Sequence, residues 1–172
     1  MRREISRPVL VSPRAAAYRA GMKILVDADA CPVKEEIYKV AWRHEVPVTI
    51  VSNSPIRVPA HPLIERVVVS DGFDAADDWI AERADPLSVC VTADILLADR
   101  CLKARAAVLA PNGKPFTTSS IGAAVATRAI MADLRAGAVG DPVGGPAPFS
   151  KADRSRFLSA LDEALVRLKR GR

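Results

Sequence analysis

Two aspartates, Asp27 and Asp29, directly follow a short apolar run in KILVDADACPVK, which spans residues 23–34. Successive side chains of a strand alternate between its two faces, so residues two apart lie on the same side. Two carboxylates held on one side repel each other and raise each other's pKa unless a cation or a proton lies between them. The spacing therefore predicts a site for a cation or a shared proton at the end of the first strand.

Further acids follow the later strands. Asp71, Asp74, Asp77 and Asp78 come after an apolar run at 64–69, and Asp94 comes after a run at 87–91. Ligands of open parallel α/β sheets bind beyond the carboxyl ends of the strands. A cluster of oxygen donors suits a hard cation, Mg²⁺ or Mn²⁺, and such an ion polarises a phosphoryl oxygen and generates hydroxide from water. The acids therefore predict a metal site for phosphoryl chemistry.

Helix capping is the alternative explanation for the same acids. Asp74 and Asp94 stand where they can cap the helices that follow, and Asp77 and Asp78 suit a first helical turn through the helix dipole. Capping does not require the paired acids after the first strand. The sequence leaves open which acid of the 71–78 segment faces the site.

Four polar residues at or near the ends of predicted elements are candidates for contacts with substrate. Lys34 opens the first helix, Asn53 follows the strand at 46–51, Thr92 follows the strand at 87–91, and Lys114 lies in the turn PNGKPF. A lysine near a helix N-terminus suits a phosphate group. The alternative is an ordinary turn, a solvated lysine and simple caps.

Composition narrows the class of protein. The chain has 172 residues, enough for one sizeable core, and a formal net charge of +5. Residues 1–21 carry +4 of this charge and the rest only +1, so bulk charge gives no strong evidence for a polyanionic partner. No apolar run is long enough to span a membrane. The three cysteines are odd in number and lack metal-binding spacing, which predicts a reduced, cytoplasmic protein.

Apolar patterning predicts the order of the elements. We expect strands at 24–26, 46–51, 64–69, 87–91 and 106–109, and helices at 33–44, 73–84, 95–104, 121–135 and 152–169. This order predicts an α/β fold with a mainly parallel sheet sandwiched by helices, followed by C-terminal helices. Residues 22–172 are expected to form a single domain, with 137–150 as a Gly- and Pro-rich linker and 1–21 as a disordered or spurious extension.

Several segments together resemble the YaiI/YqxD family, an uncharacterised bacterial group similar to PIN-like domains. They are DADACPVK (27–34), VSDGFDAADDWI (69–80), VTADILLADR (91–100), PNGKPFT (111–117) and GGPAPFSKADRSRFLSALD (144–162). The resemblance implies a PIN-like, Rossmann-like three-layer fold and a nuclease that uses Mg²⁺ or Mn²⁺, with RNA as the expected substrate. Carried over by position, Asp27, Asp78 or Asp74, and Asp94 would be the metal ligands, with Asp29 as a further catalytic acid.

Two other functions remain open from the residues. ILVDADA also resembles the nucleophile strand of haloacid-dehalogenase-like phosphatases, in which Asp27 would become phosphorylated. The third alternative is an inactive binding or assembly protein, for which the Ala-rich helix 121–135 and the segment 137–150 would supply a homo-oligomer interface.

Overall fold

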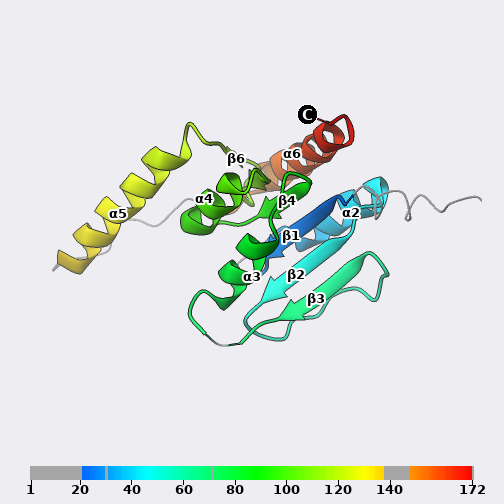
Figure 1. Ribbon diagram of the computed structural model, residues 1–172, viewed down its shortest axis with the longest axis horizontal. Coiled ribbons are helices and arrows are strands. Elements are labelled where there is room, and N and C mark those ends of the chain that lie inside the picture. The colour runs from blue at the N-terminus through cyan, green and yellow to red at the C-terminus, as the bar shows by residue number, and fades with distance from the viewer. Residues whose placement is uncertain (1–20, 30, 71, 138–147, 172) are drawn as a thin grey trace, which may run out of the picture.

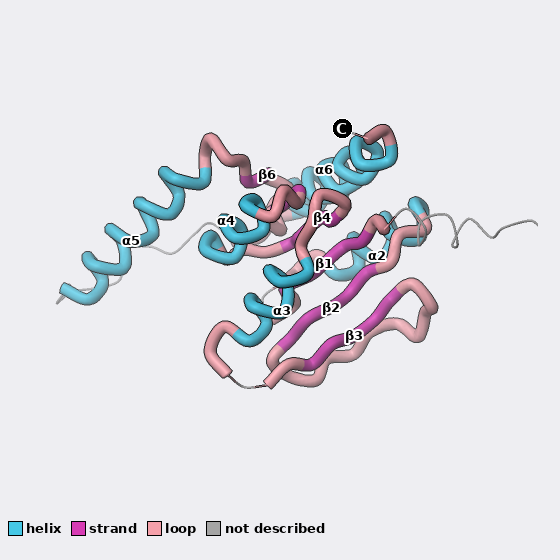
Figure 2. Tube along the Cα trace, in the orientation of Figure 1, coloured by secondary structure: helices cyan, strands magenta, loops and turns pink. Residues whose placement is uncertain are grey.

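The fold is taken from a computed structural model, which describes residues 21–29, 31–70, 72–137 and 148–171. The described elements are β1 (Lys23–Asp27), α2 (Lys34–His44), β2 (Val48–Ser52), β3 (Ile64–Val68), α3 (Ala75–Arg83), β4 (Ser88–Val91), α4 (Ile95–Lys103), β5 (Ala107–Leu109), β6 (Pro115–Phe116), α5 (Ile121–Gly137) and α6 (Lys151–Lys169). Figure 1 shows them in space, and Figure 2 separates helices from strands.

One sheet of six strands, in the order β3-β2-β1-β4-β5-β6, organises the molecule. The first five strands are parallel, and β6 pairs with β5 in the antiparallel sense. The chain builds β1, β2 and β3 outward in one direction and then returns to place β4 on the other side of β1. This reversal puts a switch point between β1 and β4, where open α/β sheets bind their ligands.

Helices cover both faces of the sheet and produce three layers. The strands are nearly continuous runs of Val, Ile and Leu, as expected for strands buried on both sides. On one face, Ile24 and Val26 share a core with residues of α2 and α6. On the other face, Leu25 shares a second core with residues of α3 and α4. The α/β architecture with a mainly parallel sheet, helices on both faces and C-terminal helices is confirmed.

Helix α6 is fixed to the body at several points. Ser150 and Asp153 form a reciprocal capping box at its start. Its inward side chains Phe157, Leu161 and Leu165 are fully buried. These contacts make the C-terminal helix part of the main core.

The end of α2 is tied to α6 by polar contacts. His44 Nε2 lies 2.6 Å from Asp162 Oδ1, and Lys169 Nζ lies 3.1 Å from His44 Nδ1. The histidine therefore serves a structural contact far from the predicted strand-end site.

Helix α5 leaves the body as an arm. Figure 1 shows it running out on the side to which the arrowheads of β1, β2 and β3 point. Ile121 is its one buried residue, whereas Ile130 and Leu134 are about three-fifths exposed.

Some details differ from the sequence-based expectations. Strand β6 was not predicted, because two residues that include a proline carry no periodic signal. Helix α2 begins at Lys34 instead of residue 33. Predicted features within 1–20 and 138–147 lie outside the described residues. Among the described helices, none is both long and apolar enough to cross a membrane.

Candidate active site at the ends of β1 and β4

Asp27 is the last residue of β1, and it is held by a hydrogen bond across the sheet. The Thr92 hydroxyl donates to Asp27 Oδ2 at 2.9 Å. Burial raises the pKa of the Asp27 carboxyl, as do the charges of Asp29 and Asp94, although the Thr92 bond lowers it. The environment thus disfavours the charged form of Asp27 despite the hydrogen bonds from the Thr92 hydroxyl and the Asp29 backbone that support it.

Asp94 belongs to the neighbouring strand end and caps α4. Its Oδ1 accepts hydrogen bonds from the backbone N–H groups of Leu96 and Leu97, at 2.8 and 3.1 Å. Its own backbone N–H donates to the Thr92 hydroxyl at 2.9 Å. The predicted cap is therefore present, and the carboxylate also adds to the charge felt by Asp27. Capping and participation in the acid site are compatible for Asp94.

Asp77 is the acid of the 71–78 segment that interacts with the strand-end pair. Burial, and then the charges of Asp94, Asp27 and Asp74, together raise its pKa to about 6. Asp77 lies three residues before the buried Ile80 and hence on the same face of α3. That spacing was readable in the sequence and is the signal that distinguishes Asp77 from its neighbour.

Asp78, the position carried over as a metal ligand, lies elsewhere on the helix. Its Oδ1 accepts a hydrogen bond from Arg100 at 2.8 Å in an exposed ion pair. One residue along a helix rotates a side chain by about 100°, which is enough to move it from the sheet side to the surface. Asp74 occupies the N-cap position of α3 without capping it through its side chain, and Asp71 lies outside the described residues.

Asp29 is exposed and is held by the residue that directly follows β2. The backbone N–H of Asn53 lies 3.2 and 3.1 Å from the two carboxylate oxygens of Asp29. Asp29 therefore does not cap α2, as one interpretation of the sequence allowed. The contact places Asn53, a candidate for contact with substrate, at the same edge of the sheet as Asp27.

The two candidate lysines lie on different sides of the site. Lys34 Nζ donates to the Cys31 carbonyl at 3.1 Å, at the start of α2. Lys114 is exposed in the turn between β5 and β6. Because β5 is two strands away from β1 in the sheet, Lys114 is the more distant of the two from Asp27.

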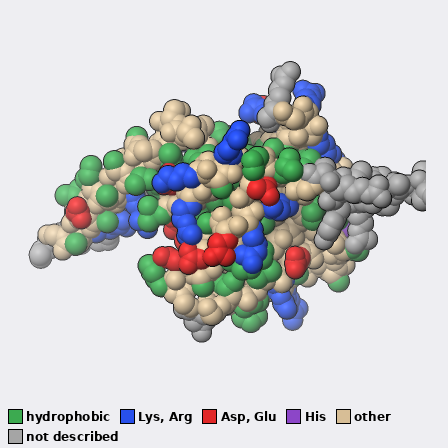
Figure 3. All heavy atoms as spheres, viewed as in Figure 1, with side chains coloured by type: hydrophobic (Ala, Val, Ile, Leu, Met, Phe, Trp, Pro, Cys, Tyr) green, Lys and Arg blue, Asp and Glu red, His purple; other side chains and the backbone are tan. Residues whose placement is uncertain are grey.

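Acidic side chains gather on the surface near α3. Figure 3 shows acidic side chains gathered over that helix, with Lys and Arg side chains beside them. Among the described residues, no three His, Cys, Asp or Glu side chains are grouped closely enough to be a ready-made metal cage. The strand-end acids thus share an electrostatic environment without forming a preformed ligand set.

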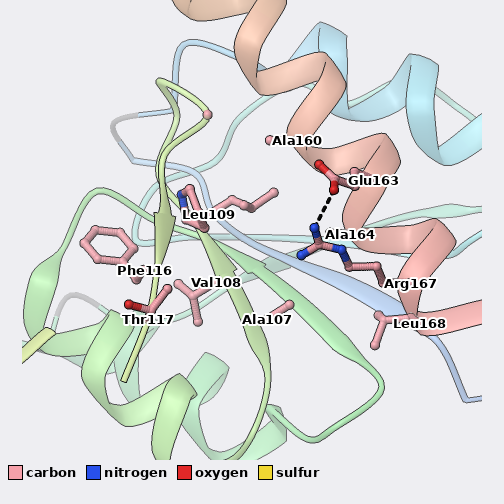
Figure 4. A pocket seen from close by; sticks show the side chains of 12 residues that line it. Ala107, Val108, Leu109, Phe116, Thr117, Ala160, Glu163, Ala164, Arg167 and Leu168 are labelled. Atoms are coloured by element: carbon pink, nitrogen blue, oxygen red, sulfur yellow. Dashed lines mark hydrogen bonds and ion pairs between the residues drawn. The ribbon is translucent and has the colours of Figure 1, made fainter. Parts of the chain in front are cut away.

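A separate cleft of about 500 Å³ lies between the β5–β6 edge of the sheet and α6. Figure 4 shows it lined by apolar side chains, with the Glu163–Arg167 ion pair at one side. None of the predicted site acids lines this cleft. Its lining offers little of the polar chemistry that the strand ends provide.

A known family accounts for most of the chain. The family described as "Uncharacterized BCR, YaiI/YqxD family" matches residues 25–167. The chain belongs to the YaiI/YqxD family. This membership covers β1 through α6, including every strand-end acid described above.

Relatives named UPF0178 protein match the chain over most of its length. The one from Sphingopyxis alaskensis is 79% identical over 86% of this chain and 96% of its own. One from Rhodopseudomonas palustris is 61% identical over 87% of this chain and 94% of its own. One from Bradyrhizobium diazoefficiens is 61% identical over 87% and 89%, respectively. No solved structure matches the chain.

Proposed function

We propose that this YaiI/YqxD protein is a Mg²⁺- or Mn²⁺-dependent nuclease that acts on RNA, with Asp27, Asp77 and Asp94 holding the metal. The observation that carries the proposal is the gathering of these acids at the strand ends, where burial, followed by their mutual repulsion, raises the pKa of Asp27 and brings that of Asp77 to about 6. Such an arrangement costs free energy in the protein alone, and a cation among the carboxylates would remove that cost.

The donor chemistry fits a hard cation. The three acids offer carboxylate oxygens, and Mg²⁺ is commonly held by only one or two carboxylates with water completing its shell. This agrees with the lack of a ready-made cage among the described residues. Asp94 Oδ1 is engaged in the cap, whereas Oδ2 has no hydrogen-bond partner among the described residues.

When bound, the metal ion would polarise a phosphoryl oxygen and lower the pKa of a bound water. The residues of the chain would hold the metal ion and keep its carboxylate ligands in position. Thr92 fixes the rotamer of Asp27 through its 2.9 Å bond, and the backbone of Asn53 fixes Asp29 beside it. Lys34 and Lys114 would contact the phosphate groups of the RNA.

The test is calorimetric titration of Mn²⁺ into the full chain and its Asp94→Asn variant. Asparagine caps a helix about as well as aspartate, so this variant removes the charge while keeping α4 capped. We expect the Mn²⁺ affinity to fall about tenfold or more, the effect of losing roughly 1.4 kcal/mol of binding free energy. Asp99→Asn is the matched control, because Asp99 is on the same helix and pairs with Lys103.

A labelled-RNA cleavage assay with Mn²⁺ then tests the reaction itself. Cleavage by the wild type that is lost in Asp94→Asn supports the nuclease. Phosphate bound covalently to Asp27 after incubation with a phosphomonoester would support the phosphatase alternative instead. Unchanged Mn²⁺ affinity in Asp94→Asn, or no binding by the folded wild type, would overturn the proposed metal site.

A further inference from the structure

The side chain of Phe73 is the most exposed large apolar group among the described residues, with 96% of its surface accessible. The other described aromatic side chains are partnered or at least partly buried. Trp42 stacks on Tyr38 and contacts His61 at a tilt. Trp79 lies under Arg83, Phe149 lies beside Arg154, and Phe116 and Phe157 pack into the cores. Phe73 is far more exposed than any of them, since Trp42, which has two ring partners, has only 41% of its surface accessible.

A tight turn presents this ring. The Gly72 carbonyl accepts a hydrogen bond from the Ala75 N–H at 3.1 Å, which closes a four-residue turn with Phe73 at its corner. Asp74 follows with φ 62° and ψ 10°, the values of the third position of a type II turn. The hydrogen bond closes the turn, and the turn leads directly into α3. The backbone of Phe73 is therefore held in a fixed conformation with its ring exposed.

The turn adjoins the acid site. Asp74, the next residue, is one of the charges that raise the pKa of Asp77. Helix α3, which this turn begins, packs against β1 and β2. The turn that carries Phe73 therefore lies at the carboxyl edge of the sheet, directly before the helix that carries Asp77.

We propose that Phe73 stacks on an unpaired base of single-stranded nucleic acid and positions the neighbouring phosphate at the acids. This inference rests on the proposed nuclease function and adds the class of substrate, a strand with unpaired bases. A single ring on a turn offers a surface the size of one base, whereas a stable protein partner needs a contiguous interface of far larger area.

The low charge of the body means that binding of a nucleic acid would depend on stacking more than on phosphate contacts. Residues 22–172 carry a formal net charge of only +1, and acidic side chains gather near the site (Figure 3). Affinity from phosphate contacts alone is therefore small. Stacking depends little on charge and tolerates any base, so it supplies binding where the protein surface does not attract phosphate.

The test measures binding of a short labelled single-stranded RNA to the full chain in EDTA, which removes divalent cations and prevents cleavage. We expect Phe73→Ala to weaken binding about ten- to a hundredfold, the range for loss of one stacked base. Phe73→Tyr should bind like the wild type. Leu87→Ala is the matched control, since Leu87 is an exposed apolar residue beside the start of β4, at the opposite edge of the sheet.

An abasic strand of the same length separates stacking from phosphate contact. The wild type and Phe73→Ala should bind this strand equally, because it has no base to stack. Equal RNA binding by the two proteins, or no RNA binding by the wild type in EDTA, would overturn the inference.

Cleavage in Mn²⁺ distinguishes this inference from the nuclease proposal. RNA bound through Phe73 but never cut would remove the proposed function and keep the stacking site. RNA cut with the same KM by the wild type and Phe73→Ala would keep the nuclease proposal and remove the stacking site. A raised KM with an unchanged kcat is the result expected if both hold.

Discussion

The Thr92 hydroxyl donates a 2.9 Å hydrogen bond to Asp27 and so joins the carboxyl ends of β1 and β4. The same hydroxyl oxygen accepts the backbone N–H of Asp94 at 2.9 Å. Thr92 is only 1% exposed, so water has little access to replace either bond. One buried hydroxyl therefore sets the relative position of two candidate metal ligands.

Replacing this hydroxyl with a methyl group should destabilise the fold. Thr92→Val keeps the side-chain shape but leaves the Asp27 carboxylate and the Asp94 N–H without their partner. We expect the free energy of unfolding in urea to fall by about 1–3 kcal/mol. Thr92→Ser, which keeps the hydroxyl, should lose less than half as much, and equal losses in the two variants would argue against the hydrogen bonds as the cause.

The raised pKa of Asp77 makes stability depend on pH. The folded state holds this proton up to about pH 6, whereas the unfolded chain releases it near 3.8. The charged form therefore costs folding free energy, and the cost grows as pH rises from about 4 to 6 and is complete above 6. After allowance for solvent screening of a half-buried group, we expect Asp77→Asn to stabilise the fold by about 1 kcal/mol at pH 7.5.

The same variant should show no gain at pH 4, where Asp77 is protonated in the folded wild type. Urea unfolding at the two pH values, without divalent cations, measures the difference. Asp78→Asn is the control, because it loses only an exposed ion pair and should change stability by less than about 1 kcal/mol at either pH. A gain from Asp77→Asn that is equal at both pH values would exclude charge repulsion as its origin.

Mn²⁺ binding should also distinguish Asp77 from Asp78, but here Asp77→Asn should cause a loss of affinity, in contrast to its gain in stability. Asp77 interacts with Asp27 and Asp94, whereas Asp78 pairs with Arg100 on the surface. We expect Asp77→Asn to weaken Mn²⁺ binding about tenfold or more and Asp78→Asn to change it less than about threefold, by calorimetry. The reverse order would assign the metal to the residue first carried over by resemblance.

Gly113 should tolerate no side chain. Its φ of 85° is in the left-handed region, and an added Cβ would lie 2.6 Å from the backbone of Arg156 and Phe157 in α6. We expect Gly113→Ala to cost about 2 kcal/mol or more in urea unfolding, through backbone strain and displacement of α6. Gly122→Ala meets nothing within 4 Å, so this control should leave stability unchanged or slightly raised.

The sequence predicted the parts of the fold that depend on local apolar patterns. Apolar runs such as Ile24–Val26 have few alternatives to a strand buried on both faces. Asp94, a residue type that favours the N-cap position, indicated the start of α4. The short strand Pro115–Phe116 was missed because its pairing with β5 depends on neighbours in space. The pairing of Asp29 with the Asn53 backbone was missed for the same reason.

The candidate site was predictable to within one turn of helix. The strand-end positions of Asp27 and Asp94 follow from the sheet alone. The choice between Asp77 and Asp78 depends on the rotation of α3, which an error of one residue changes by about 100°. Phe73 carried no sequence signal at all, since its exposure results from the turn that holds it.

The buried position of α6 affects the order in which the chain can fold as it is made. Phe157, Leu161 and Leu165 cover a sheet face whose strands come from residues 23–109. On the ribosome, those strands emerge well before residues 151–169, so one apolar face waits uncovered while the intervening segment is synthesised. Contacts between distant segments also slow folding. The nascent chain is therefore expected to be most prone to aggregation just before α6 emerges.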